Sequence, residues 1–343
     1  MTRRIAINGY GRIGRAFQRA LWESGLGHEL SVVHINEPAD LDSMVYLTRY
    51  DSTHGRFPGK VERQGDQLII GGQSVSISHA QEPEGVDWAA LNIDLLVECS
   101  GQYNNRPQLT RFLDAGVPRL LLSHPGGTAS DVDATIVHGV NQDALTGAER
   151  LVSGASCTSN AVVPVLHLLD QHYGIEQVFL NTLHSAMNDQ PVADGYHHTD
   201  LRRTRSAMQS IIPVSTGLAN GVERLLPQLS GRVHAKAIRV PTLNVSAIDL
   251  VVNLKRNAST AEVNNLLKAA ASGPLAGLMA YTEEVHASID FNHDVHSAIV
   301  DASQTYSDGG HLVNLMIWFD NEWGFSNRLI DVARSWLAKA TAI

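Results

Sequence analysis

The sequence predicts an α/β protein in which a doubly wound parallel sheet is followed by an α+β domain with a mixed or antiparallel sheet. Three observations support this fold class. Short apolar strands alternate with helical patterns in the first half of the chain. Longer stretches with two-residue alternation occupy the second half. The length of 343 residues is enough for two domains.

The first half carries the strand–helix alternation. Strands are expected at residues 4–10, 30–36, 93–101 and 119–126, and a helix is expected to follow the first strand and run through Ala20. These runs are nearly continuous in apolar residues, which is typical of parallel strands that are buried on both faces. The pattern therefore predicts a parallel sheet with helices on both sides.

The second half has a different pattern. The strand-like stretches at 177–187, 232–255 and 311–321 are longer, and several of them alternate between apolar and polar residues. Such alternation indicates strands with one buried face, as in mixed or antiparallel sheets.

The change of pattern falls near residue 156, which gives the expected domain boundary. Residues 1–156 are expected to form the first domain and residues 157–321 the second. Residues 322–343 have helical apolar spacing, and this helix is expected to pack back on the first domain.

The composition is that of a soluble globular protein, with 43% hydrophobic and 18% charged residues. The net charge of −9 argues against a general binder of nucleic acid or anionic membrane, so neither partner is expected. Two cysteines give no disulfide framework and fit a reducing compartment. No apolar run approaches the ~20 residues that span a bilayer, and the sequence reaches glycine too early for a secretory signal. The expected location is therefore cytoplasmic.

A glycine-rich turn follows the first predicted strand. Gly9, Gly11 and Gly14 have the G-x-G-x-x-G spacing of a dinucleotide-binding turn. The first glycine allows the tight turn, the second lets the backbone approach a pyrophosphate, and the third allows close packing of helix on strand. The spacing alone also fits a purely structural turn, but here it joins a strand to a helix, whose N-terminus attracts phosphates. The first domain is therefore expected to be of the Rossmann type.

Glu37 lies at the end of the second predicted strand. A carboxylate at that position accepts hydrogen bonds from the hydroxyls of the adenosine ribose and repels a 2′-phosphate. The sequence therefore favours NAD over NADP, although a solvated charge at a strand end is the alternative interpretation of Glu37.

Cys157 and His184 form a candidate catalytic pair. Cys157 lies where a helix is expected to begin, and the free N–H groups and positive end of the helix dipole favour thiolate over thiol. His184 ends the next predicted strand, so a helix–strand unit could return it to the same cleft. The pair would supply a nucleophile and a general base. Taken alone, a buried cysteine and a structural histidine, one of 16 histidines in the chain, fit equally well.

Candidate anion-binding groups form a third element. Arg203 lies in the segment DLRRTR, and Arg239 lies on a predicted strand. Thr216 and Gly217 lie at an expected turn whose backbone N–H groups can point at an oxyanion. Guanidinium groups also suit phosphates. Each arginine alone would be a surface or ion-paired residue, but together with a thiol and a dinucleotide turn they favour an anion site.

Other reactive residues are expected to be structural. Cys99 is expected to be a buried strand residue. His197 and His198, and the pair His293 and His296, have spacings seen in metal sites. No cysteine accompanies them and no third ligand is evident, so no metal is expected.

Five segments resemble the glyceraldehyde-3-phosphate dehydrogenase family, and the resemblance extends over essentially the whole chain. They read INGYGRIGR, SGASCTSN, LRRTRSAMQSIIPVSTG, RVPTLNVSAIDL and FDNEWGFSNR. Within the family, HSAMNDQPVADGYHHTDLRRTRSAMQSIIP and FNHDVHSAIVDASQT look most like the bacterial branch that oxidises D-erythrose 4-phosphate on the route to pyridoxal 5′-phosphate. The resemblance implies NAD as cofactor, a phosphorylated aldose as substrate and a homotetramer.

The resemblance also implies roles for individual residues. Cys157 would attack the aldehyde, and His184 would activate the thiol and assist proton movement; hydride transfer to NAD would then leave a thioester on Cys157. The positions that match cofactor-binding motifs of the family are Gly9, Gly11, Arg12, Ile13, Gly14, Glu37, Ser123 and Asn321. The positions that match its anion pockets are Ser156, Thr158, Thr216 and Gly217 for one pocket and Arg239 for the other, with Arg203 in support.

Several positions depart from the family pattern. Glycolytic members carry a threonine three residues after the catalytic histidine, and its hydroxyl helps to bind the substrate phosphate; here the residue is Met187, which cannot donate a hydrogen bond. We therefore expect Met187 to disfavour glyceraldehyde 3-phosphate. Gly154 replaces an asparagine and is expected to loosen the loop that presents Cys157. Ala161 replaces a common second cysteine, which leaves no resolving thiol nearby. The segment STG at 215–217 keeps the glycolytic form.

The expected activity is NAD-dependent oxidation of D-erythrose 4-phosphate to 4-phospho-D-erythronate, with the thioester released by water. The nearest alternative is a phosphorylating glyceraldehyde-3-phosphate dehydrogenase, which the retained STG segment favours. A Cys–His hydrolase without cofactor is a different class, and the glycine turn with Glu37 argues against it. A non-catalytic nucleotide sensor is a third class, and the joint presence of Cys157, His184 and Arg239 argues against it.

Overall fold

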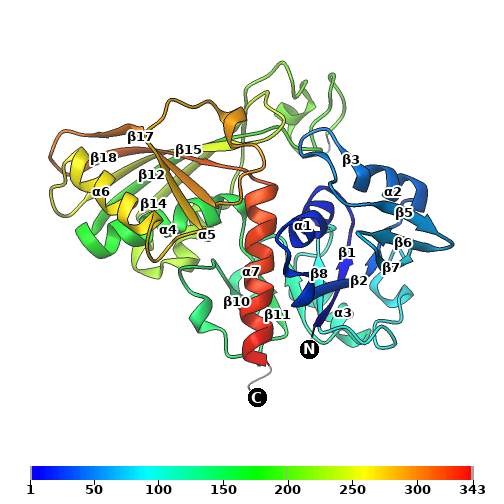
Figure 1. Ribbon diagram of the computed structural model, residues 1–343. Helices are drawn as coiled ribbons and strands as arrows, with labels where there is room; N and C mark the ends of the chain where they lie inside the picture. Colours follow the sequence, from blue (N-terminus) through cyan, green and yellow to red (C-terminus); the bar gives the residue numbers. More distant parts are fainter. Residues whose placement is uncertain (1, 198, 341–343) are drawn as a thin grey trace. The chain divides into compact units, whose positions relative to one another are not determined.

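The computed structural model describes residues 2–197 and 199–340. The chain forms two compact units (Figure 1). The first contains the residues up to Ser156 together with the C-terminal segment from Ser326, and the second extends from Cys157 to Phe325. Each unit has its own large sheet with helices, so the expected α/β fold class is confirmed.

The first unit is built on a nine-stranded sheet. Its strand order is β10-β11-β9-β8-β1-β2-β7-β6-β5, with parallel pairing from β10 to β7 and an antiparallel extension through β6 and β5. The strands are β1 (Arg3–Asn8), β2 (Leu30–Asn36), β5 (Val61–Gln64), β6 (Gln67–Ile70), β7 (Gln73–Ser78), β8 (Leu95–Glu98), β9 (Leu120–Leu122), β10 (Ala134–Thr135) and β11 (Leu151–Ser153). Because β2 and β8 flank β1 on opposite sides, the sheet reverses its strand order at β1. Ligands bind at the carboxyl ends of strands at such a switch point.

Three helices and a small ribbon complete the N-terminal part of this unit. They are α1 (Arg12–Glu23), α2 (Leu41–Arg49) and α3 (Arg106–Asp114), with the ribbon β3 (Tyr50–Asp51) and β4 (Gly55–Arg56). The sequence caps these helices locally. Asp40 accepts a hydrogen bond from the backbone of Ser43 at 2.8 Å before α2, and Asn105 forms a capping box with Gln108 before α3. Such caps satisfy backbone donors that a helix start otherwise leaves open.

The second unit contains a seven-stranded mixed sheet with the order β13-β14-β12-β15-β18-β17-β16. β12 runs parallel to β14 and antiparallel to β15, so both pairings meet on the strand that ends at His184. The strands are β12 (Ile175–His184), β13 (Ile212–Val214), β14 (Val233–Arg239), β15 (Ser246–Leu254), β16 (Met279–Thr282), β17 (Ala298–Ser307) and β18 (Leu312–Phe319). Along β15 and β18 buried and less buried residues alternate, as the two-residue pattern predicts for a sheet with one covered face.

Helices α4 (Cys157–Tyr173), α5 (Leu218–Leu225) and α6 (Thr260–Ala271) pack against this sheet (Figure 1). Helix α4 begins at Cys157, where the sequence predicts a helix start. The last helix, α7 (Trp323–Ala340), belongs to the first unit from Ser326 onward. Its Trp336 is fully buried. Residues 341–343 of the predicted helix lie outside the described residues.

Two sequence expectations need correction. The stretch predicted as a strand over 93–101 ends at Glu98, so Cys99 is not a strand residue; it lies one residue beyond β8 and is only partly buried. The stretch over 232–255 is two strands, interrupted after Arg239, and Val245 has a positive φ of 64° just before β15. Hydropathy alone did not reveal the second break, because apolar residues continue through the loop at 240–245.

Candidate active site

The glycine turn of the first unit is tight because two backbone segments approach each other there. Gly9 has a φ of +86°, and a Cβ on it would lie 2.6 Å from the backbone nitrogen of Ser100. A Cβ on Gly14 would lie 2.2 Å from the carbonyl oxygen of Gly9. A side chain at either position is therefore excluded by backbone atoms that have no room to shift. A Cβ on Gly11, by contrast, would meet no atom within 4 Å, so Gly11 leaves an open space at the N-terminus of α1.

This open space is part of a pocket of about 190 Å³ at the switch point of the sheet. Its lining residues are Asn8, Gly9, Gly11, Asn36, Glu37, Pro38, Ala80, Gln81, Cys99, Ser100, Gln102 and Tyr103. The pocket thus joins the glycine turn to the carboxyl ends of β1 and β2. These residues fit a dinucleotide, because Gly11 leaves space for a pyrophosphate and Glu37 offers a carboxylate for a ribose.

Glu37 is held in the pocket wall by two backbone donors. Its Oε2 accepts a hydrogen bond from the backbone of Tyr10 at 2.7 Å, and its Oε1 accepts one from Ala39 at 3.1 Å. The first bond ties the carboxylate to the glycine turn, so the two elements expected to bind cofactor are directly connected.

We expect Glu37→Ser to shift the nucleotide preference from NAD toward NADP, because the carboxylate that repels a 2′-phosphate is removed. The measurement is kcat/KM for each nucleotide at saturating aldehyde, and the NADP/NAD ratio should rise by about tenfold or more, the order of one charge interaction at a partly solvated site. Glu29→Ser, which removes a carboxylate at the start of β2, serves as the control. An unchanged ratio would show that Glu37 is only a solvated strand-end charge.

Below the pocket lies a buried polar chain that the sequence analysis did not anticipate. Asn8 donates to the Glu98 carboxylate at 2.5 Å, and the backbone of Ser100 donates to it at 2.7 Å. Asn36 in turn donates to Asn8 Oδ1 at 2.8 Å. Burial raises the pKa of Glu98. The chain fixes the ends of β1, β2 and β8, which carry the pocket walls.

The remaining predicted cofactor residues of this unit do not line the pocket. Arg12 makes a two-pronged ion pair with Asp51, at 2.5 and 3.2 Å. Burial alone would raise the pKa of Asp51, but the hydrogen bonds from Arg12 and from nearby backbone groups lower it to about 2. Ile13 is the second residue of α1, and Ser123 donates its backbone N–H to Glu98 O at 3.0 Å.

Cys157 and His184 meet in the second unit. Cys157 Sγ lies 3.8 Å from His184 Nε2 and 3.9 Å from Thr158 Oγ1. His184 Nδ1 lies 2.8 Å from the carbonyl oxygen of Ser185. A carbonyl oxygen can only accept, so Nδ1 carries the proton and Nε2 of the neutral ring presents its lone pair to the thiol. This is the arrangement of a thiol with an adjacent base.

Burial acts on both members of this pair. It raises the pKa of the Cys157 thiol, with Asp320 contributing in the same direction, and it lowers the pKa of the His184 imidazole. The burial of the thiol therefore opposes the effect of the helix start, whose backbone donors lower the pKa of the thiol. The pair can still exchange a proton, because Nε2 lies 3.8 Å from Sγ and the thiolate and imidazolium that result have opposite charges.

Asn321 is connected to His184 by two buried hydroxyls. Its Oδ1 accepts from Ser185 Oγ at 3.0 Å and from Ser246 Oγ at 2.9 Å. Ser246 Oγ also accepts from the backbone of Ser185, whose carbonyl orients His184. Both donors hold the oxygen of the Asn321 amide, so its nitrogen points away from them. The sequence did not predict a role for Ser185 or Ser246, because a single small polar residue at a strand end has no distinctive pattern.

Arg239 lies beside His184 because the parallel register of β12 and β14 makes the two residues direct neighbours. Only 8% of Arg239 is exposed. Its Nη1 donates to Asp189 Oδ1 and, at 3.1 Å, to Gln190 Oε1. Asp189 Oδ2 also accepts from Arg203 Nη1 at 3.0 Å. The structure thus joins the two arginines through one carboxylate that the sequence analysis did not single out.

The other predicted anion-pocket residues lie at helix starts. Ser156 immediately precedes α4, and Thr158 is the second residue of that helix. Thr216 and Gly217 precede α5, where Thr216 Oγ1 accepts from the backbone of Leu218 at 3.1 Å. Helices α4 and α5 pack together. These four residues thus lie at two helix starts, and whether they bind an anion stays a prediction.

Gly154 is tightly packed, contrary to the expected loosening of its loop. A Cβ there would lie 2.5 Å from Cδ2 of Leu329 in α7, and its backbone donates to Leu122 O at 3.0 Å. An asparagine would push α7 away from this loop. The glycine therefore permits close packing of the last helix within the first unit.

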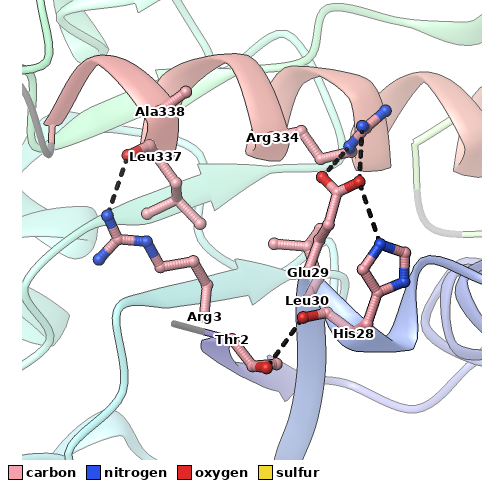
Figure 2. A pocket seen from close by; sticks show the side chains of 8 residues that line it. All are labelled: Thr2, Arg3, His28, Glu29, Leu30, Arg334, Leu337 and Ala338. Atoms are coloured by element: carbon pink, nitrogen blue, oxygen red, sulfur yellow. Dashed lines mark hydrogen bonds and ion pairs between the residues drawn. The ribbon is translucent and has the colours of Figure 1, made fainter.

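A larger surface pocket, of about 410 Å³, lies in the first unit at the amino ends of β1 and β2 (Figure 2). Its charged groups are already paired. Arg334 binds the Glu29 carboxylate at 2.9 and 3.0 Å, and Arg3 donates to Leu337 O at 3.4 Å. It lies at the opposite end of β1 and β2 from the glycine turn, and neither Cys157 nor His184 lines it.

The histidines with metal-like spacing have other partners. His293 stacks on Trp323 with the ring centroids 3.6 Å apart, and His296 Nδ1 lies 2.7 Å from Asp294 Oδ1. His197 Nδ1 accepts from the backbone of Asp200, whereas His198 lies outside the described residues. Within the described ranges, no three His, Cys, Asp or Glu side chains gather as metal ligands. Among residues 2–197 and 199–340, no helix combines the length and apolar character needed to cross a membrane.

Two protein-family models match the chain. The NAD binding domain of glyceraldehyde 3-phosphate dehydrogenase matches residues 3–106, and the C-terminal domain of glyceraldehyde 3-phosphate dehydrogenase matches residues 156–321. Together the two matches cover most of the chain. The first of them includes the glycine turn and Glu37, and it confirms NAD as the cofactor.

Proposed function

The chain belongs to the glyceraldehyde-3-phosphate dehydrogenase family, as an NAD-dependent dehydrogenase, and on this basis we propose that it is a D-erythrose-4-phosphate dehydrogenase. The proposed reaction converts D-erythrose 4-phosphate to 4-phospho-D-erythronate, in the biosynthesis of pyridoxal 5′-phosphate. The unit up to Ser156 would serve as the NAD-binding domain, with the C-terminal helix, and the unit from Cys157 as the catalytic domain.

Cys157 and His184 carry the chemistry in this proposal. His184 Nε2 accepts the thiol proton while Sγ attacks the aldehyde carbon, and it then gives this proton to the former carbonyl oxygen, so that a thiohemiacetal forms. When bound, NAD would supply the oxidant as the hydride acceptor. His184 takes the hydroxyl proton of the thiohemiacetal in this oxidation, which leaves a thioester on Cys157. After His184 has released that proton to solvent, it accepts a proton from the water that attacks the thioester carbon and gives it to the leaving Sγ, so the acid is released with Cys157 restored.

Three groups are assigned to binding. Arg239, supported by Arg203, is proposed to hold the substrate phosphate, because a guanidinium matches phosphate geometry. The start of α5 with Thr216 and Gly217, together with Ser156 and Thr158 at the start of α4, is proposed as the second anion site. The proposed cofactor-binding residues are Gly9, Gly11, Arg12, Ile13, Gly14, Glu37, Ser123 and Asn321.

The choice of substrate rests on the methionine at position 187. It begins the turn that holds Asp189 and Gln190 against Arg239, and its side chain is 47% exposed. A thioether cannot donate a hydrogen bond to a phosphate at the place where glycolytic relatives have a hydroxyl. Erythrose 4-phosphate carries its phosphate one carbon further from the aldehyde than glyceraldehyde 3-phosphate does. A changed phosphate site is therefore expected for the longer substrate.

A phosphorylating glyceraldehyde-3-phosphate dehydrogenase is the second candidate, and one feature favours it. The segment STG at 215–217 keeps the glycolytic form at the start of α5. In that case inorganic phosphate, rather than water, would attack the thioester.

NADH formation at 340 nm tests the two candidates directly. Each aldehyde phosphate is offered with and without inorganic phosphate. Faster turnover of erythrose 4-phosphate that does not depend on added phosphate supports the proposed function. Preference for glyceraldehyde 3-phosphate with a strict phosphate requirement would make the glycolytic activity the correct one.

We expect Met187→Thr to raise kcat/KM for glyceraldehyde 3-phosphate about tenfold relative to erythrose 4-phosphate, because one hydrogen bond to a charged group is restored. The measurement is the ratio of the two kcat/KM values. Met208→Thr, at another exposed methionine of the same unit, is the matched control. An unchanged ratio in Met187→Thr would remove this residue from the specificity argument.

The proposed assembly is a homotetramer in the cytoplasm. Large apolar side chains are exposed along one segment of the second unit, namely Val192, Tyr196, Leu201 and Ile211. Such a concentration is unusual for a surface in water and supports contact with further copies of the chain. Cys99 and Cys157 are both unpaired, which suits a reducing compartment.

A further inference from the structure

Gln190 has a buried hydrogen-bond donor that nothing in the described structure satisfies. Its side chain is 8% exposed, and its Nε2 has no hydrogen-bond partner. An unsatisfied buried amide group costs free energy, so native structures rarely keep one without a reason. Its position close to Arg239 and Met187 suggests what that reason is.

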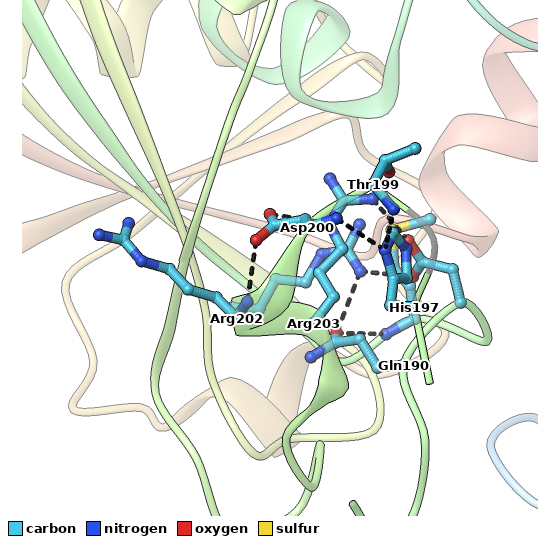
Figure 3. Close-up of polar contacts among 9 residues, drawn as sticks. Gln190, His197, Thr199, Asp200, Arg202 and Arg203 are labelled. Atoms are coloured by element: carbon cyan, nitrogen blue, oxygen red, sulfur yellow. Dashed lines mark hydrogen bonds and ion pairs between the residues drawn. The ribbon is translucent and has the colours of Figure 1, made fainter. Parts of the chain in front are cut away.

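The orientation of the Gln190 amide is determined by its neighbours. Oε1 accepts hydrogen bonds from Arg239 Nη1 at 3.1 Å and from the backbone of Met187 at 3.2 Å. Both of these groups can only donate. The amide oxygen must therefore face them, and an exchange of oxygen and nitrogen is excluded. Nε2 faces away from both and carries no dashed line in Figure 3.

The same turn also determines which part of Arg239 is available. Asp189 and Gln190 engage Nη1, while Nε and Nη2 make no hydrogen bond to any described residue. The backbone of Gln190 donates to Met187 O at 3.0 Å, which closes the turn. Gln190 thus holds Nη1 of the guanidinium with its amide oxygen and has a further N–H donor next to it. This donor lies on the same turn as Met187, whose side chain has no hydroxyl.

We propose that Gln190 is a specificity-determining residue whose Nε2 donates a hydrogen bond to the phosphate of the aldehyde substrate, alongside Arg239. The donor replaces the hydroxyl that Met187 cannot supply. Met187 is exposed and unbranched, so its side chain can move as the phosphate enters the turn. The inference rests on the proposed phosphate site at Arg239 and deepens it.

The test separates binding of the phosphate from the rest of catalysis. In Gln190→Glu, the carboxylate still accepts from Arg239 and Met187, but the donor is lost. We expect KM for erythrose 4-phosphate to rise about ten- to a hundredfold, the range of a hydrogen bond to a charged group, with kcat changed less than threefold. Turnover of D-erythrose, which has no phosphate, is expected to stay at the wild-type level. Gln190→Met, which adds no charge, is expected to show the same loss with the phosphorylated substrate.

Two further variants make the result specific. Gln209→Glu adds the same charge at an exposed position of the same unit and is expected to leave KM unchanged. Adding Met187→Thr to Gln190→Glu is expected to restore part of the lost affinity, because a hydroxyl returns to the turn. Equal losses with D-erythrose and with its phosphate would overturn the proposal and leave Gln190 a structural support of Arg239. An unchanged KM in Gln190→Glu would also overturn it.

The outcome is independent of which sugar the protein prefers. If wild-type protein turns over glyceraldehyde 3-phosphate faster than erythrose 4-phosphate, the proposed substrate is wrong. The Gln190 variants are then measured with glyceraldehyde 3-phosphate against D-glyceraldehyde. The ratio between a phosphorylated aldehyde and its phosphate-free counterpart tests Gln190 in either case.

Discussion

Cys157→Ser is expected to lower kcat by about 10⁴-fold or more, because the attacking sulfur is replaced by a hydroxyl that ionises far less readily. NADH formation with erythrose 4-phosphate measures this loss. The affinity for NAD should be retained, because the glycine turn and Glu37 belong to the first unit, and calorimetric titration with NAD checks it.

The second cysteine provides the control for this experiment. Cys99→Ser changes a residue in the wall of the cofactor pocket and leaves the Cys157–His184 pair intact. Its kcat should stay within a few-fold of the wild-type value. Turnover by Cys157→Ser above about one hundredth of the wild-type rate would mean that Cys157 is not the nucleophile.

His184→Gln is expected to lower kcat by about 10²–10⁴-fold, the usual contribution of a positioned general base. The variant removes the acceptor that lies 3.8 Å from Sγ. His167→Gln, at a histidine within α4, is the matched control and should retain most of the activity.

The pH dependence should change together with the rate. Because burial lowers the pKa of His184, a larger share of the wild-type imidazole is neutral, and able to accept a proton, at a given pH than in an ordinary histidine. In the variant, Cys157 must lose its proton to water, and burial raises the pKa of that thiol. Residual activity and alkylation of Cys157 by iodoacetamide should therefore increase only above about pH 8.5, the ordinary thiol value.

Alkylation rates between pH 6 and 10 provide the measurement, with Cys157→Ser as the background for Cys99. Wild-type alkylation should already be appreciable near neutral pH, where His184 can take the proton. Identical pH profiles for wild type and His184→Gln would show that His184 does not act on the thiol.

The sequence by itself determined the features that depend on local chain geometry. The spacing of Gly9, Gly11 and Gly14 is sufficient because the turn, the strand before it and the helix after it occupy one short segment. The helix start at Cys157 was also predictable, because it depends only on neighbouring residues. The two sheet types followed from the period of burial along each strand, because that period reports whether one face or both faces are covered.

The tertiary structure alone decided which side chains meet. Arg239 lies beside His184 only through the register of β12 with β14, and Asn321 reaches Ser185 and Ser246 from a distant part of the second unit. Neither contact has a spacing that a sequence pattern could report. The upward shift in the pKa of Cys157 was also decided by the tertiary structure. The helix start can be predicted from the sequence, but the burial that raises the pKa of the thiol comes from several elements and exists only after the chain has folded.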